Sequence, residues 1–213
     1  RDGADGMIRL EKNMRHFGCW KEEYRSHLVP VLGDLNLPRL GMDPQTYADL
    51  AKRIQVVYHN GAVLNFVFPY EQLKRTNVTG TQECLRFACA GQPKYFHYVS
   101  SYSVFDTPDH FDQKVLESDP LENPDGYFLG YSQSKWVAEK LVNIAQSRGL
   151  KAAIYRPGDI TGALKNGIWN LGDLISRALV GCVQLGYAPK MNVQLPLTLL
   201  PEGVYWKGIS SAQ

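Results

Sequence analysis

The chain has 213 residues, of which 44% are hydrophobic and 21% are charged. Its 23 Lys and Arg and 21 Asp and Glu residues leave a net charge of +2 without a basic block, which argues against nucleic-acid binding through a clustered basic surface. There is no run of 18 apolar residues that would predict a transmembrane helix, and the opening RDGADGMIRL has neither a signal-peptide core nor an initiator Met. We therefore expect a cytoplasmic protein without a membrane partner, either processed or part of a larger chain.

The cysteines and histidines do not form a metal-binding pattern. The sequence contains no CxxC and no HxxxH pair, and the spacings are wide. Reduced thiols in a cytosolic protein are the expected state. We predict no metal site and no disulfide among Cys19, Cys84, Cys89 and Cys182.

Helical and strand-like segments alternate along the chain. Apolar spacing and end signals predict helices over residues 5–25, 44–53, 69–90, 127–149 and 170–182. Short apolar or β-branched runs predict strands over 28–35, 54–59, 94–101 and 151–158, with a long loop over 106–126. Alternation of this kind is typical of a parallel sheet with helices on both faces, an α/β fold. The pattern weakens after about residue 188.

The strongest local chemical signal is the pair Tyr131 and Lys135 in the segment YSQSK. Residues four apart lie on one helix face. A nearby ammonium group favours the phenolate and lowers the pKa of a tyrosine, so such a pair can move a proton to or from a carbonyl oxygen. Chance alone supplies pairs of this kind, and the context decides their weight.

Two strand ends supply that context. Ser101 is at the end of the strand predicted over 94–101, and the segment RPGDITG (156–162) begins at the end of the strand predicted over 151–158. Ligands of parallel α/β sheets bind beyond the carboxyl ends of the strands. A hydroxyl there can hold the same oxygen that the tyrosine protonates.

With HNGA (59–62), NVTGT (77–81) and RPGDITG, these residues resemble the extended short-chain dehydrogenase/reductase superfamily. VSSYSVFDT, VLESDPL, GYSQSKWVAEKL and GCVQLGYAP resemble one branch more closely. This branch comprises the thioester reductase domains of nonribosomal peptide synthetases, aminoadipate reductases and carboxylic acid reductases. The resemblance implies NADPH-dependent reduction of an acyl or peptidyl thioester, held on the phosphopantetheine arm of a carrier protein, to an aldehyde or alcohol.

The resemblance also implies roles for individual residues. Tyr131 would donate the proton, Lys135 would lower the pKa of Tyr131 and bind the nicotinamide ribose, and Ser101 would hold the substrate carbonyl oxygen. Beside Tyr131 and Lys135, the implied cofactor-binding residues are Arg1 for the 2′-phosphate, Asp34 and Leu35 at the adenine, Asn60, Gly61 and Ala62 under the cofactor, Asn77, and Pro157, Gly158 and Ile160 along the nicotinamide.

Two parts of the family pattern are missing from the sequence. A GxxGxxG turn, which would hold the cofactor pyrophosphate at a helix N-terminus, does not occur. Arg1 falls where the pattern places an Arg after the second strand. We therefore expect a Rossmann-like, doubly wound parallel sheet that lacks the first β-α-β unit and most of the C-terminal substrate subdomain. Residues 1–188 would form the partial NADPH-binding domain, and 189–213 the start of that subdomain or an aberrant tail.

Two other functions remain open at this stage. The chain could belong to another extended reductase or epimerase, such as a fatty acyl-CoA reductase or a nucleotide-sugar epimerase. It could also be a catalytically inactive fragment that only contacts a neighbouring carrier domain. The absent phosphate-binding turn favours the inactive fragment, whereas the intact Ser101, Tyr131 and Lys135 argue against it.

Overall fold

The computed structural model describes residues 3–110, 113–122, 125–164, 166–190 and 197–198. The chain divides into two compact units. The larger unit is Val31–Pro157, and the smaller one combines Arg1–Pro30 with Gly158–Gln213. Arg1 and most of the segment 189–213 lie outside the described residues, so the expectations for them stay predictions.

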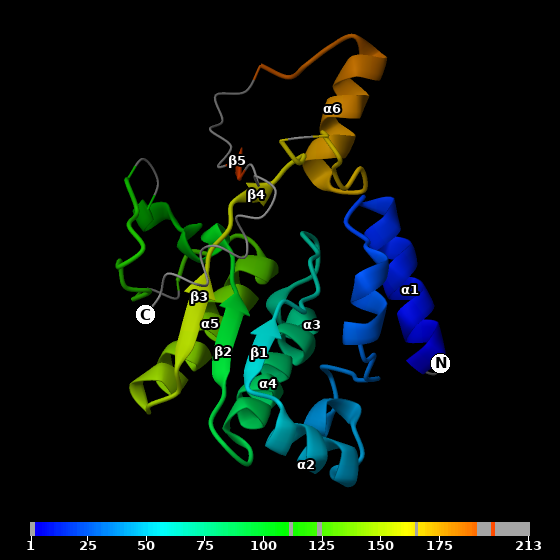
Figure 1. Cartoon of the computed structure of the whole chain (residues 1–213). Coiled ribbons are helices and arrows are strands. Elements are labelled where there is room, and N and C mark those ends of the chain that lie inside the picture. Colours follow the sequence, from blue (N-terminus) through cyan, green and yellow to red (C-terminus); the bar gives the residue numbers. More distant parts are fainter. Residues whose placement is uncertain (1–2, 111–112, 123–124, 165, 191–196, 199–213) are drawn as a thin grey trace. The chain divides into compact units, whose positions relative to one another are not determined.

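The larger unit contains a parallel sheet of three strands in the order β1-β2-β3 (Figure 1). These strands are β1 (Val56–His59), β2 (Tyr95–Val99) and β3 (Ala152–Tyr155). Their register pairs Val57 with Phe96 and Phe96 with Ala152. Three of the four predicted strands and their parallel arrangement are therefore confirmed.

Four α-helices belong to this unit: α2 (Pro44–Arg53), α3 (Tyr70–Lys74), α4 (Gly80–Cys89) and α5 (Gly130–Ser147). The Asp43 carboxylate caps α2, because it accepts hydrogen bonds from the amides of Gln45 and Thr46 at 3.0 Å each. Short 3-10 segments are η2 (Pro38–Gly41), η4 (Tyr102–Phe105) and η5 (Pro108–His110). The helix predicted over 44–53 is confirmed, and the long loop over 106–126 contains only η5 among its described residues.

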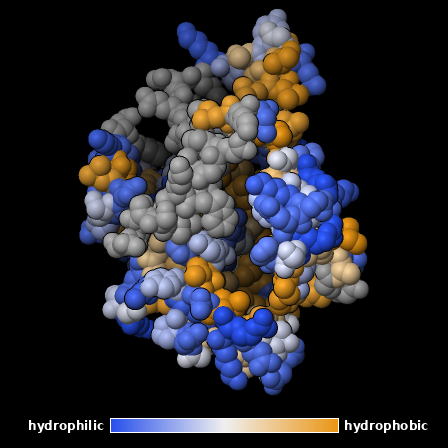
Figure 2. Space-filling view, in the orientation of Figure 1, coloured by the Kyte–Doolittle hydropathy of each residue, from blue (hydrophilic) through white to orange (hydrophobic). Residues whose placement is uncertain are grey.

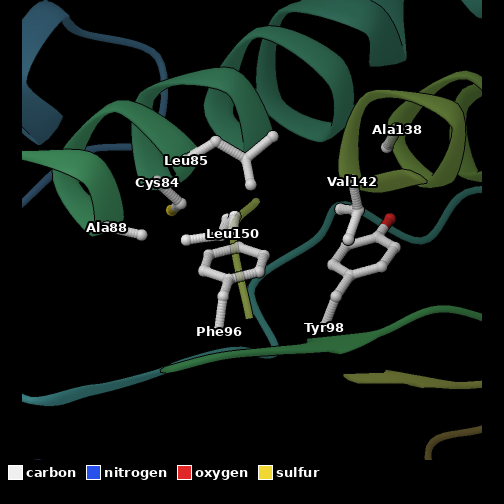
Figure 3. Close-up of a cluster of buried hydrophobic side chains, with 8 residues drawn as sticks. All are labelled: Cys84, Leu85, Ala88, Phe96, Tyr98, Ala138, Val142 and Leu150. Carbon is white, nitrogen blue, oxygen red and sulfur yellow. The ribbon is translucent and has the colours of Figure 1, made fainter. Parts of the chain in front are cut away.

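The core of this unit lies between β2 and the helices α4 and α5 (Figure 3). Phe96 and Tyr98 are two residues apart on β2, so their side chains point to the same face of the sheet. Both are almost completely buried. Around them pack Cys84, Leu85 and Ala88 of α4, Ala138 and Val142 of α5, and Leu150.

The smaller unit contains α1 (Gly3–His16), the 3-10 segment η1 (Glu22–His27), α6 (Leu174–Leu185) and a short parallel pair, β4 (Asp159–Ile160) with β5 (Leu197–Thr198). The Asp173 side chain caps α6, and Gly186 ends it at a φ of 68°. Apolar side chains of α6 are exposed, and Figure 2 shows this apolar surface.

Two sequence predictions are wrong in this part of the chain. The helix predicted over 5–25 ends at His16, because Gly18 takes a φ of 65° and turns the chain before η1. The strand predicted over 28–35 does not form, and Val29 is 84% exposed. A strand needs a neighbour for its ladder of hydrogen bonds, none of the described strands pairs with this segment, and Pro30 has no amide hydrogen to donate.

The helix predicted over 69–90 forms, but it is not uniform. A π-helical segment, η3 (Arg75–Thr79), separates α3 from α4. π-Helical turns are rare and occur often at functional sites. The helices expected over 127–149 and 170–182 are present with later starts, at Gly130 and Leu174.

A search for a helix long and apolar enough to cross a membrane found none within the described ranges.

The start of α5 is packed against the backbone that leads into α3. A Cβ atom at Gly130 would lie 2.4 Å from the Tyr70 nitrogen and 2.6 Å from the Phe68 carbonyl oxygen. We predict that Gly130→Ala lowers the free energy of unfolding by about 1–3 kcal/mol, because backbone atoms must move apart. Urea denaturation measures the change. Gly181→Ala is the control, since a Cβ there meets nothing within 4 Å, and an equal loss in both variants would contradict the packing argument.

Candidate active site

The candidate site lies where the parallel strands of the larger unit end. Ser101 follows β2, Asn60 follows β1, Pro157 lies two residues after β3, and Tyr131 is in the first turn of α5. The Tyr102 amide donates to the Pro157 carbonyl at 3.1 Å, which joins the ends of β2 and β3. The structure therefore brings together four segments that are up to 97 residues apart, from 60 to 157.

Ser101 is held at the start of η4. Its hydroxyl oxygen accepts hydrogen bonds from the Ser103 amide at 3.2 Å and the Ser103 hydroxyl at 2.9 Å. It also shares a side-chain hydrogen bond with Tyr131. Ser101 and Tyr131 are thus direct neighbours, as a shared contact with one substrate oxygen requires.

Tyr131 is largely protected from solvent, with the ring of Phe66 edge-on at a centroid distance of 6.4 Å. Burial raises the pKa of Tyr131 above its ordinary value, and the hydrogen bond with Ser101 works in the opposite direction. The phenol is therefore protonated near neutral pH. The lowering of the Tyr131 pKa by Lys135, which the resemblance implies, stays a prediction.

Lys135 is buried one helical turn after Tyr131. Its ammonium group donates to the Val99 carbonyl at 2.7 Å and lies 4.4 Å from the centroid of the Tyr98 ring. Burial lowers the pKa of Lys135 to about 8, and the negative charge of Glu139 raises it. The end of β2 thus fixes the position of the lysine.

Asn77 connects the loop after β1 to α5. Its Oδ1 accepts the Val63 amide at 2.8 Å, and its Nδ2 donates to the Val63 carbonyl at 3.0 Å and to the Ser134 hydroxyl at 2.9 Å. Ser134 in turn donates to the Tyr131 carbonyl at 2.7 Å. Asn77 lies in the middle of η3 and is buried, so the π-helical segment carries an amide whose hydrogen bonds hold loop and helix together.

The segments expected to contact the adenine and to pass under the cofactor are adjacent. Leu35 packs against Gly61, where a Cβ would lie 2.8 Å from its Cδ1, and against Gly80, where a Cβ would lie 2.9 Å from its Cβ. Asp34 accepts hydrogen bonds from the Asn36 amide and side chain at 2.8 Å each, which lower its pKa. Asn60 and Ala62 are exposed beside Gly61.

The remaining predicted cofactor residues are distributed differently. Pro157 ends the larger unit, whereas Gly158 and Ile160 belong to the smaller one. Ile160 pairs with Thr198 in the β4–β5 ladder. Arg1 lies outside the described residues.

Two buried titratable residues near the site have no role in the sequence analysis. His59 ends β1, and its Nε2 lies 2.9 Å from the Thr81 hydroxyl oxygen. Glu139 on α5 binds Ser100 and Arg156. The only sequence signal for Glu139 is its spacing of four residues from Lys135, which places both on one helix face.

No group of three or more His, Cys, Asp and Glu side chains that could hold a metal ion occurs in the described part of the chain.

The burial of His59 makes the stability of the fold dependent on pH. Desolvation, aided by the nearby Lys135 charge, lowers the pKa of His59 from 6.5 to about 4, so His59 is neutral in the folded chain. The unfolded chain binds this proton below pH 6.5, and the stabilisation present above 6.5 is therefore lost as the pH falls towards 4, by up to about 3 kcal/mol.

We predict that His59→Gln removes this part of the pH dependence, measured as the difference in free energy of unfolding between pH 7 and pH 4. Gln retains a polar group towards Thr81 but does not titrate. His16→Gln, at an exposed position of α1, is the control and leaves the pH dependence as it is. If His59→Gln retains the full dependence, another group is responsible.

The chain is similar in sequence to proteins of a known family. The sequence matches the NAD_binding_4 family, described as "Male sterility protein", over residues 1–204. It is 41% identical over 206 residues to a linear gramicidin synthase protein of Brevibacillus parabrevis, covering 96% of this chain and 4% of that protein. It is 39% identical over 203 residues to L-2-aminoadipate reductase of Saccharomyces cerevisiae, covering 90% of this chain and 15% of that protein.

Among solved structures, the terminal R domain from the myxalamid PKS-NRPS biosynthetic pathway is similar, with a TM-score of 0.89 and 43% sequence identity. The match covers 94% of this chain and 50% of that chain. The expected Rossmann-like α/β fold is therefore confirmed, and the chain spans about half of a solved reductase domain. It belongs to the NAD_binding_4 family.

Proposed function

We propose that this chain belongs to an NADPH-dependent reductase that releases an acyl or peptidyl thioester from the phosphopantetheine arm of a carrier protein, as an aldehyde or alcohol. The observation that carries the proposal is the contact between Ser101 and Tyr131 beside a buried Lys135, at the carboxyl ends of a parallel sheet. Similarity to a linear gramicidin synthase protein and to an R domain supports the substrate class.

Tyr131 is the proton donor in this proposal. Reduction of a carbonyl places negative charge on the oxygen, and a donor must be protonated at the working pH. The raised pKa of Tyr131 meets this requirement. Ser101, hydrogen-bonded to Tyr131, would donate to the same oxygen and orient it.

Lys135 has the donors to hold the nicotinamide ribose. An ammonium group has three donors, and the Val99 carbonyl takes one of them. With a pKa of about 8, Lys135 is mostly protonated at neutral pH and loses its charge as the pH rises above about 8. The bound cofactor supplies the hydride, while these side chains bind, orient and protonate. We place the nicotinamide-binding part within residues 1–188 and the start of a substrate subdomain after it.

The role of Tyr131 is tested by Tyr131→Phe in the protein that contains this chain. We predict a fall in kcat for thioester reduction of about 10²–10⁴-fold, because the proton donor is lost, with cofactor binding unchanged. The readout is nicotinamide oxidation with a carrier-bound acyl thioester. Tyr95→Phe is the matched control, since Tyr95 lies at the other end of β2 and is 53% exposed. Turnover near that of the unaltered protein would exclude Tyr131 as donor.

Titration of the 213-residue chain with NADPH and with NADH tests the cofactor. We predict saturable binding of NADPH, followed by nicotinamide fluorescence, with weaker binding of NADH. Lys135→Met is expected to weaken both equally, since its proposed contact is the ribose that both cofactors share. Absence of binding by a folded chain would show that the nicotinamide-side residues alone do not suffice. Epimerisation of a UDP-sugar, or reduction of a fatty acyl-CoA, in place of reduction of the carrier-bound thioester would assign the chain to another enzyme class.

A further inference from the structure

Glu139 is a charged side chain that the roles above do not use, and it is completely buried on α5. Its Oε2 accepts a hydrogen bond from the Ser100 hydroxyl at 2.5 Å. Its Oε1 accepts from Nε of Arg156 at 3.0 Å and from Nη2 at 2.6 Å. A buried carboxylate needs such partners because it has lost its hydration. Three donors therefore hold it in one orientation.

The two partners of Glu139 lie at the strand ends that carry the site. Ser100 is between β2 and Ser101, and Arg156 is between β3 and Pro157. One carboxylate on α5 therefore ties both strand ends to the helix that presents the proposed proton donor. A shift of this carboxylate would move Ser101 relative to α5.

Arg156 extends the connection to the long loop. Its Nη1 donates to the Glu117 carbonyl at 3.1 Å, and its guanidinium carbon lies 4.8 Å from the centroid of the Phe105 ring. Stacking on a ring and a forked pair of hydrogen bonds are specific to the planar guanidinium group. Arg156 thus joins η4 and the loop 106–126 to the Glu139 carboxylate.

Glu139 also acts on the charge of Lys135, one helical turn earlier. The titratable groups around Lys135 are Glu139 and Tyr131 on its own helix, His59 from β1 and Tyr98 from β2. Burial keeps His59 and Tyr98 neutral near pH 7, and Tyr131 is protonated there as well. Of these groups, the Glu139 carboxylate is the one whose charge favours a protonated Lys135.

We propose that Glu139 and Arg156 are positioning residues of the reductase site, which hold the ends of β2 and β3 against α5 and keep the charge at Lys135 balanced. The inference rests on the proposed function, because it assigns Lys135 and Ser101 their tasks. Stability alone gives little reason for this pair, since apolar residues of similar volume often stabilise a fold as well as a buried ion pair does.

Glu139 and Arg156 have opposite charges, so removing one or the other shifts the pKa of Lys135 in opposite directions. In Glu139→Gln the amide still accepts from Ser100, but the negative charge is gone, and we predict that the pKa of Lys135 falls by about 1 unit. In Arg156→Gln the Glu139 charge is no longer offset, and we predict that the pKa of Lys135 rises. Both variants lose stability. If Glu139 and Arg156 only stabilised the fold, the pKa of Lys135 would therefore change in the same direction in both variants.

The pH dependence of lysine acylation measures these shifts in the full-length protein. A small acylating reagent modifies the neutral amine, and peptide mass spectrometry reports the midpoint for Lys135 without any need for turnover. The second readout is kcat/KM for thioester reduction against pH. Since protonated Lys135 is the active form, the alkaline limb moves to lower pH in Glu139→Gln and to higher pH in Arg156→Gln.

Two controls separate positioning from folding. Glu83→Gln removes another buried glutamate that is paired with an arginine, Arg86 on α4, and leaves the Lys135 midpoint unchanged. Arg156→Lys retains the positive charge and leaves the acylation midpoint of Lys135 near that of the unaltered protein. It loses the paired hydrogen bonds to Glu139 and the contact with the Phe105 ring, and this loss lowers kcat.

The proposal would be overturned if the acylation midpoint of Lys135 moved in the same direction in Glu139→Gln and Arg156→Gln, or if it moved in neither. An unaltered protein that reduces no thioester would contradict the proposed function instead, and the acylation midpoints would still decide the inference.

Discussion

The burial of the Lys135 ammonium group is the constraint on which the site depends. A charge removed from water must be met by dipoles or opposite charge, and here a carbonyl at the end of β2, a tyrosine ring and a carboxylate on the same helix meet it. Each of these groups is on a rigid element. Together with the packing of Ala138 and Val142 against β2, these contacts hold α5, and with it Tyr131, against the sheet.

The π-helical segment η3 holds the loop after β1 in place. Asn77 uses all of its amide hydrogen-bonding groups on the Val63 backbone and on Ser134. Thr81 donates to the Asn77 carbonyl at 2.6 Å, so the His59 Nε2 hydrogen is left to donate to Thr81. The chain of contacts runs from the end of β1 through the helix to α5. Loss of one member would leave buried polar atoms unpaired.

Prediction from the sequence worked best where chemistry and spacing coincide on one element. Tyr131 and Lys135 are on one helix, and Ser101 follows a strand whose apolar pattern is clear. It failed for residues 28–35, where apolar composition suggested a strand but no neighbouring strand is described to pair with it. It also missed Glu139 and His59, because their partners are 17 to 39 residues away in the chain and no local pattern marks them.

The sequence by itself determined most of the helices and the three sheet strands of the larger unit, the family, and the three side chains proposed to carry the reaction, because period, caps and motifs are local properties. Only the tertiary structure decided which charges are buried together. The raised pKa of Tyr131 and the lowered pKa of Lys135 depend on desolvation, and Glu139 pairs with Arg156 because packing brings the two residues together. Desolvation exists only once α5 has packed against the strand ends.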